Sequence, residues 1–239
     1  MVDLELDEGV AVITIDRPHA RNAIARATMG ELEHALDAAD GARALVIKGA
    51  GDRAFVSGGD LKELATIRTE DEATAMALRM RRICDRLAAF PAPVIAALNG
   101  TALGGGAEVA VAADIRVAAD DIRIGFTQAT LAIMPAWGGA ERLAALVGKG
   151  RALLLAGTGA VLDAAEAERV GLVDQVLPRA SFEAGWRSLA RSLATGTARE
   201  IKHVTTAALP PEQAARAFAR LWVADEHWQA TEKAKPRSG

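Results

Sequence analysis

The sequence contains little of what several protein classes require. Its 239 residues include one cysteine, Cys84, so no internal disulfide can form, which predicts a reducing, cytoplasmic environment. The four histidines do not stand at the spacings of metal ligands. We therefore expect neither a disulfide-stabilised fold nor a metal centre.

Charge and hydropathy patterns exclude two further kinds of partner. No uninterrupted apolar stretch reaches the about 18 residues that a membrane span needs. The first eight residues alternate and are acidic, unlike the basic start of a signal peptide. The net charge is −3, so the composition gives no basic surface for nucleic acid. We expect no membrane and no nucleic-acid partner.

Apolar residues, by contrast, are abundant. They make up 51% of the chain against 25% charged residues, enough to bury a sizeable core. Short apolar runs alternate with helical patterns as far as Arg179, and this alternation predicts an α/β core over residues 1–179. From Ser181 the pattern is that of amphipathic helices, so residues 180–239 are predicted to form a helical C-terminal region.

The chain is organised around the stretch Asn99–Glu108. The apolar run 93–98 before it has the length of a buried strand, and an alanine-rich helical pattern follows from Ala107. Three glycines, 104–106, let main-chain N–H groups approach a ligand closely. The spacing excludes a P-loop and a dinucleotide fingerprint, because neither motif is completed. The turn therefore either binds a negative oxygen or only permits tight packing.

A second glycine-rich segment, predicted as a loop over residues 49–60, can supply a second main-chain N–H donor. Gly59 in this loop and Gly105 in the first can each present a main-chain N–H group. Two converging donors form an oxyanion hole, which stabilises negative charge that develops on a carbonyl oxygen.

Several further motifs follow one another in order along the chain. The full set is Arg17-Pro18, Ala54–Glu63, Asn99–Glu108, Ile115–Ala118, Pro135–Leu143 and Ala164–Val173. Through these motifs the chain resembles the crotonase (enoyl-CoA hydratase/isomerase) family over residues 10–180. The turn 135–139 and the tail around Trp222 are similar to the acyl-CoA decarboxylase-like branch of that family.

The resemblance implies stacked ββα units and a helical C-terminal region used for trimerisation, as a homotrimer or a dimer of trimers. It implies a coenzyme A thioester as substrate, with no separate cofactor, its carbonyl oxygen between the N–H groups of Gly59 and Gly105. Residues implied to contact the CoA thioester are Arg21, Ala23, Ser57, Gly58, Asp60, Leu61, Lys62 and Trp137.

The reaction depends on two positions. A hydratase of this family uses two glutamates, of which Glu108 matches the first, whereas Gln128 stands at the second. Gln cannot exchange a proton near neutral pH. Three reactions stay open: hydration by Glu108 with water held by Gln128, double-bond isomerisation, and decarboxylation of a methylmalonyl- or ethylmalonyl-type thioester. A non-catalytic acyl-CoA-binding protein is the alternative of another class.

Overall fold

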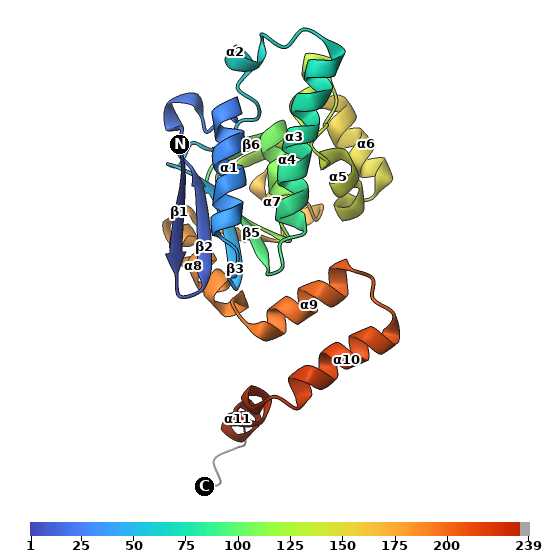
Figure 1. The fold of residues 1–239 in the computed structure, drawn as a ribbon. Coiled ribbons are helices and arrows are strands. Elements are labelled where there is room, and N and C mark those ends of the chain that lie inside the picture. Colours follow the sequence, from blue (N-terminus) through green and yellow to red (C-terminus); the bar gives the residue numbers. More distant parts are fainter. Residues whose placement is uncertain (235–239) are drawn as a thin grey trace.

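The computed structural model describes residues 1–234, and two β-sheets form its centre (Figure 1). The larger sheet has the order β1-β2-β3-β5-β7-β10, with β1 antiparallel to β2 and all other neighbours parallel. Its strands are β1 (Val2–Asp7), β2 (Val10–Ile15), β3 (Ala44–Gly49), β5 (Val94–Leu98), β7 (Ile115–Ala119) and β10 (Gln175–Leu177). Every residue of β5 is buried, as expected for a parallel strand covered on both faces.

The smaller sheet carries the loops of the candidate site. Its order is β4-β6-β8-β9, with only the β8–β9 pair antiparallel. The strands are β4 (Ala54–Val56), β6 (Thr101–Leu103), β8 (Arg123–Gly125) and β9 (Val161–Asp163). Because β4 and β6 are parallel neighbours, the glycine-rich segments that follow them leave the sheet at the same edge.

Helices cover the sheets, and short turns position the loops. The helix α1 (Arg26–Ala38) packs on β1, β2 and α3 (Glu70–Ala88), which begins with a capping box between Thr69 and Glu72. The remaining elements of this region are η1 (Pro18–Ala20), α2 (Leu61–Leu64), α4 (Gly105–Ala110), η2 (Thr127–Leu131), α5 (Gly139–Val147), α6 (Lys149–Thr158), α7 (Ala164–Arg169) and η3 (Arg179–Ser181).

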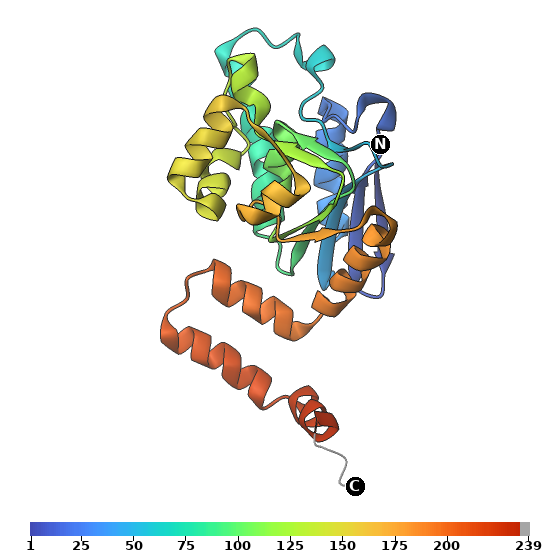
Figure 2. The same cartoon turned by 180° about the vertical axis from the view of Figure 1, so that it is seen from behind.

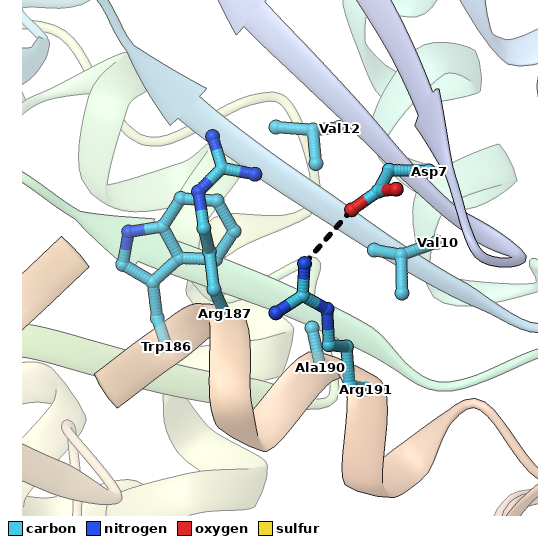
Figure 3. Close-up of a pocket in the computed structure, with 7 residues that line it drawn as sticks. All are labelled: Asp7, Val10, Val12, Trp186, Arg187, Ala190 and Arg191. Carbon is cyan, nitrogen blue, oxygen red and sulfur yellow. Dashed lines mark hydrogen bonds and ion pairs between the residues drawn. The ribbon is translucent and has the colours of Figure 1, made fainter. Parts of the chain in front are cut away.

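The helix α8 (Phe182–Leu193) lies against the larger sheet, opposite α1 (Figures 1 and 2). Its Trp186 is completely buried in the common core. Figure 3 shows how this helix meets the hairpin of β1 and β2: Arg191 reaches Asp7, 3.0 Å away, beside the apolar side chains of β2. The helix α8 thus packs with the residues before Arg179. The domain division that we predict at Arg179 stays a prediction.

The last helices leave the core as an arm, α9 (Gly196–Thr206), α10 (Pro211–Trp222) and α11 (Asp225–Ala234) (Figures 1 and 2). Lys202 joins α9 to residues just before β5 and β7: its buried ammonium lies 2.7 Å from Asp114 and donates to the carbonyl of Ala92. No helix within residues 1–234 is long and apolar enough to cross a membrane.

The predicted α/β class and the helical C-terminal region are confirmed. The prediction of a loop throughout residues 49–60 is wrong, because β4 forms within it by pairing with β6. The helix expected from Ala107 begins at Gly105. Three-residue strands such as β4 and β9 carry too few side chains for an alternating pattern to be detected.

A glycine on α4 gives a test of this packing. A Cβ on Gly106 would overlap the carbonyl oxygen of Val56, so α4 can approach β4 only without a side chain there. We expect Gly106→Ala to destabilise the protein by about 2–4 kcal/mol. Gly150→Ala on α6 is the control: its Cβ meets nothing within 4 Å, and we expect unchanged or slightly higher stability. Equal thermal unfolding temperatures of the two variants would contradict the prediction.

Candidate functional site

Two glycine-containing loops meet at one end of the smaller sheet. A Cβ built on Gly58 would lie 3.3 Å from the main-chain nitrogen of Gly105, which shows how closely they approach. Gly58 has φ +102° and Gly104 has φ +54°, values that L side chains rarely adopt. The glycines therefore shape both loops as well as allow their close approach.

The N–H groups of Gly59 and Gly105 are not used by the fold. Gly59 forms a parallel bridge with Ile24, in which the Ile24 N–H donates to Gly58 and Ile24 accepts from Asp60. In such a bridge the N–H of the middle residue points to the opposite side. Gly105 is the first residue of α4, so its N–H has no intrahelical acceptor. Within residues 1–234 neither N–H has a protein acceptor.

Glu108 follows one turn later on α4, and its carboxylate is fixed at both oxygens. Oε2 accepts from the N–H of Trp137 at 2.7 Å and from that of Gly139 at 2.9 Å. Oε1 accepts from the side-chain amide of Gln128 at 2.9 Å. The side chain is 2% exposed. Three residues that follow Glu108 by 20 to 31 positions thus orient its carboxylate.

Burial raises the pKa of the Glu108 carboxyl above its ordinary value. The N–H donors of Gly139, Trp137 and Gln128 oppose this effect because they stabilise the charged form, but desolvation dominates. A carboxyl whose pKa is raised toward neutrality can both accept and return a proton, which is the property required of an acid–base catalyst.

Gln128 is buried in η2 with one polar atom left over. Its Nε2 is committed to Glu108, whereas its Oε1 is buried and has no hydrogen-bond partner among the described residues. A buried amide oxygen without a partner is costly, which points to a donor that arrives with a ligand. The side chain therefore presents an acceptor beside the carboxylate.

The indole of Trp137 lies against the two glycine loops. A Cβ on Gly105 would overlap its six-membered ring, and a Cβ on Gly59 would lie 3.9 Å from the same ring. Trp137 is 6% exposed. The structure thus brings together Glu108, Gln128 and Trp137 with the two predicted donor glycines.

The other predicted contact residues lie around Gly59 on two adjoining loops. The N–H of Ser57 donates to Arg21, and the Ser57 hydroxyl faces the Ala20 carbonyl at 3.5 Å. Asp60 caps α2 and pairs with Arg17 at 3.0 Å, and this hydrogen-bonded guanidinium lowers the pKa of the Asp60 carboxyl. Ala23 is buried, whereas the side chains of Arg21, Leu61 and Lys62 are exposed.

Arg21 also lines a separate groove of about 330 Å³ formed by residues 18–22 and 50–54. Ser57, Asp60, Leu61 and Lys62 do not line this groove. Among residues 1–234 no cluster of histidine, cysteine, aspartate and glutamate is arranged to hold a metal ion.

Sequence reasoning missed the groups that orient Glu108. The main-chain N–H groups of Trp137 and Gly139 belong to the turn 135–139, which the sequence indicates only as a turn opening a helix. Arg142 was also missed: it donates to the Trp137 carbonyl at 3.2 Å and pairs with Asp85. The spacing of Arg142, one helical turn after Gly138, was a signal that it could contact the turn. No sequence pattern shows which group a main-chain N–H faces.

Comparison with known proteins identifies the class. The enoyl-CoA hydratase/isomerase family profile matches residues 5–232. The short-chain-enoyl-CoA hydratase of Clostridium acetobutylicum is 39% identical over 179 residues, covering 74% of this chain and 68% of the relative. The crotonyl-CoA hydratase of Syntrophomonas wolfei is 40% identical over 177 residues, covering 73% and 68%.

Solved structures agree. The crystal structure of enoyl-CoA hydratase from Bacillus anthracis superposes with a TM-score of 0.87 at 31% identity, over 98% of this chain and 96% of that one. The chain therefore belongs to the enoyl-CoA hydratase/isomerase (crotonase) family, and the predicted crotonase fold is confirmed. The resemblance to the decarboxylase branch is not shown by these matches.

The Glu108 environment gives a prediction that separates folding from chemistry. In Glu108→Gln the new side-chain oxygen can accept from Trp137 and Gly139, and its amide can donate to a rotated Gln128. A raised folded-state pKa means that the native state binds more protons, so wild-type stability falls as pH rises through that pKa. We expect the variant to gain stability relative to wild type as the pH rises from the ordinary glutamate pKa through the raised pKa of folded Glu108, measured by thermal unfolding. A constant difference across this range would contradict a raised Glu108 pKa.

Proposed function

We propose that the protein hydrates a 2-enoyl-coenzyme A thioester through an enolate held in an oxyanion hole. The observation that carries the proposal is the buried Glu108–Gln128 pair, which combines a proton acceptor with an unpartnered amide oxygen. The free N–H groups of Gly59 and Gly105, on loops that closely approach each other, support the same reaction. The family membership of the chain supports the acyl-CoA substrate.

In the proposed reaction one carboxylate handles a single proton twice. A water molecule donates one hydrogen bond to Glu108 Oε1 and one to Gln128 Oε1, and its oxygen attacks Cβ of the enoyl group. Glu108 takes a proton from this water while the Cα=Cβ electron pair moves to the thioester oxygen, forming an enolate. Gly59 and Gly105 donate to that oxygen. Glu108 then returns its proton to Cα, so that the net change is addition of one water.

Gln128 is the residue that separates the competing reactions. Because its Nε2 is committed to Glu108, the atom it can offer to a ligand is an acceptor. Water and hydroxyl groups can donate to that atom, whereas the carboxylate of a malonyl-type thioester would be repelled by it and by charged Glu108. Decarboxylation of a methylmalonyl- or ethylmalonyl-type thioester therefore requires the rotated amide and a neutral Glu108, and it is our second candidate because of the Pro135–Gly139 turn.

The loop residues that we expect to contact coenzyme A belong to this proposal. Arg21 and Lys62 are exposed cations on the two loops, and we expect them to meet phosphate groups. Asp60 has a positioning role and does not bind coenzyme A in this proposal, because its carboxylate is already paired with Arg17.

We further propose that the chain forms a homotrimer or a dimer of trimers through its C-terminal arm. Phe218, Trp222, Val223 and Trp228 are each between 46% and 73% exposed, which is costly for an isolated chain. An apolar groove of about 340 Å³ also lies between α9 and α10. Light scattering of the purified protein tests the proposal, and a mass of one chain would contradict it.

Assays with two substrates test the proposed reaction. We expect purified protein to add water to crotonyl-CoA, and Glu108→Gln to lose about 10²–10⁴-fold in kcat/KM while retaining thioester binding. Because the charged form of Glu108 is the base, wild-type kcat/KM should rise with pH through a pKa above the ordinary glutamate range. Release of CO₂ from methylmalonyl- or ethylmalonyl-CoA without crotonyl-CoA hydration would favour decarboxylation. Binding without any turnover would support the non-catalytic alternative.

Replacement of Gln128 gives a sharper test. Gln128→Glu restores a second proton-transferring group, so we expect crotonyl-CoA hydration to rise by about 10²-fold. Two neighbouring buried carboxyls cannot both ionise easily, so the pH profile of the variant should become bell-shaped, with one pKa raised further. Gln128→Leu is the control that removes the acceptor, and we expect it to be slower than wild type. A leucine variant as fast as wild type would exclude a role for the amide oxygen.

A further inference from the structure

Two apolar side chains stand at the predicted oxyanion hole, one at each glycine. The Trp137 ring occupies the space where a Cβ of Gly105 would be, and the Leu64 Cδ1 atom lies 2.7 Å from the position of a Cβ on Gly59. The same indole is 3.9 Å from that second position. The two side chains come from different elements, the turn before α5 and the short helix α2. Both side chains therefore lie beside Gly59, and the indole also lies beside Gly105.

The main chain of Trp137 is held at both of its polar groups. Its N–H donates to Glu108 at 2.7 Å, and its carbonyl accepts from Arg142 at 3.2 Å. Arg142 is in turn paired with Asp85 on α3. The next residue, Gly138, has φ +88°, and a side chain there would overlap the Arg142 guanidinium. The indole is thus carried on an anchored turn, so its position is set by the same contacts that orient Glu108.

This anchoring limits the path of an acyl group. A thioester oxygen held by Gly59 and Gly105 places its attached carbons within a few ångströms of both donors. The acyl Cα and Cβ must also reach the carboxylate of Glu108. This carboxylate accepts a hydrogen bond from the main-chain N–H of Trp137, so it lies close to that residue. An acyl chain therefore runs alongside the indole, and carbons beyond Cβ compete with a ring that is 6% exposed and cannot swing aside with its backbone.

We propose that Trp137, supported by Leu64, is the specificity-determining residue that restricts the site to thioesters of short acyl chains, of about four carbons. The inference rests on the proposed function, because it assumes a thioester oxygen between Gly59 and Gly105. The inference adds a substrate class to that function. It attributes the limit on acyl-chain length to the volume of the side chains beside the oxyanion hole. Truncating the indole leaves every main-chain donor to Glu108 in place.

The test compares crotonyl-CoA with trans-2-dodecenoyl-CoA. For the wild type we expect kcat/KM to favour crotonyl-CoA by at least about 10²-fold, since even one methylene in a hydrophobic pocket changes selectivity about 10–200-fold. In Trp137→Ala this preference should fall by about 10-fold or more, with the pH profile set by Glu108 unchanged. Leu64→Ala should change the preference in the same direction but less. Trp228→Phe on the arm removes an indole away from the site and should leave the preference as in wild type.

A binding measurement keeps the test independent of turnover and of one variant's folding. Saturated butyryl-CoA should change the tryptophan fluorescence of the wild type and of Trp228→Phe, and this change should be lost in Trp137→Phe. Dodecanoyl-CoA should bind wild type more weakly than butyryl-CoA. If the length preference in binding holds while no enoyl-CoA is hydrated, the proposed reaction fails and the inference stands. Equal preference in wild type and Trp137→Ala, or equal binding of both thioesters by wild type, would overturn the inference.

Discussion

The carboxylate of Glu108 is almost completely removed from water, and a charge in that position is tolerable only because N–H groups surround it. Two of these donors are main-chain groups of the turn 135–139, and the third is the amide of Gln128. A Cβ on Gly139 would overlap the glutamate side chain, so the turn can come this close only with glycine at that position. This one set of hydrogen bonds connects α4 to η2 and to the turn that leads into α5.

The same interaction connects stability with chemistry. Desolvation raises the pKa of Glu108, and the N–H donors restrain that rise because they stabilise the charged form. A fully stable core would contain neither a buried carboxyl nor an unpartnered amide oxygen. The protein tolerates both, side by side, in a region where the surrounding packing is otherwise apolar.

The fold supplies this arrangement with few specialised residues. Parallel pairing of β4 and β6 brings two loops to one edge, and glycine at positions 58 and 104 permits their backbone conformations. Arg142 then holds the third loop through the Trp137 carbonyl, with Asp85 behind it. The Arg142 side chain thus holds the main chain of the turn, and main-chain N–H groups of the same turn donate hydrogen bonds to Glu108. The exposed apolar side chains of the arm stand apart from this network, which is consistent with a separate role in assembly.

The sequence alone determined the α/β class and the two glycine-rich segments, because strand-like runs, helical periodicity and glycine clusters are local patterns. Glu108 and Gln128 were predicted as site residues through the resemblance to the family, and their roles stay predictions. The sequence could not show that β4 lies inside a predicted loop, because a three-residue strand exists only by pairing with β6. Only the tertiary structure decided that Trp137 and Gly139 donate to Glu108, that the Gln128 oxygen is left unpartnered, and that the indole covers the glycines. The direction of an N–H group and the volume beside it depend on residues distant in the chain, so no local pattern contains them.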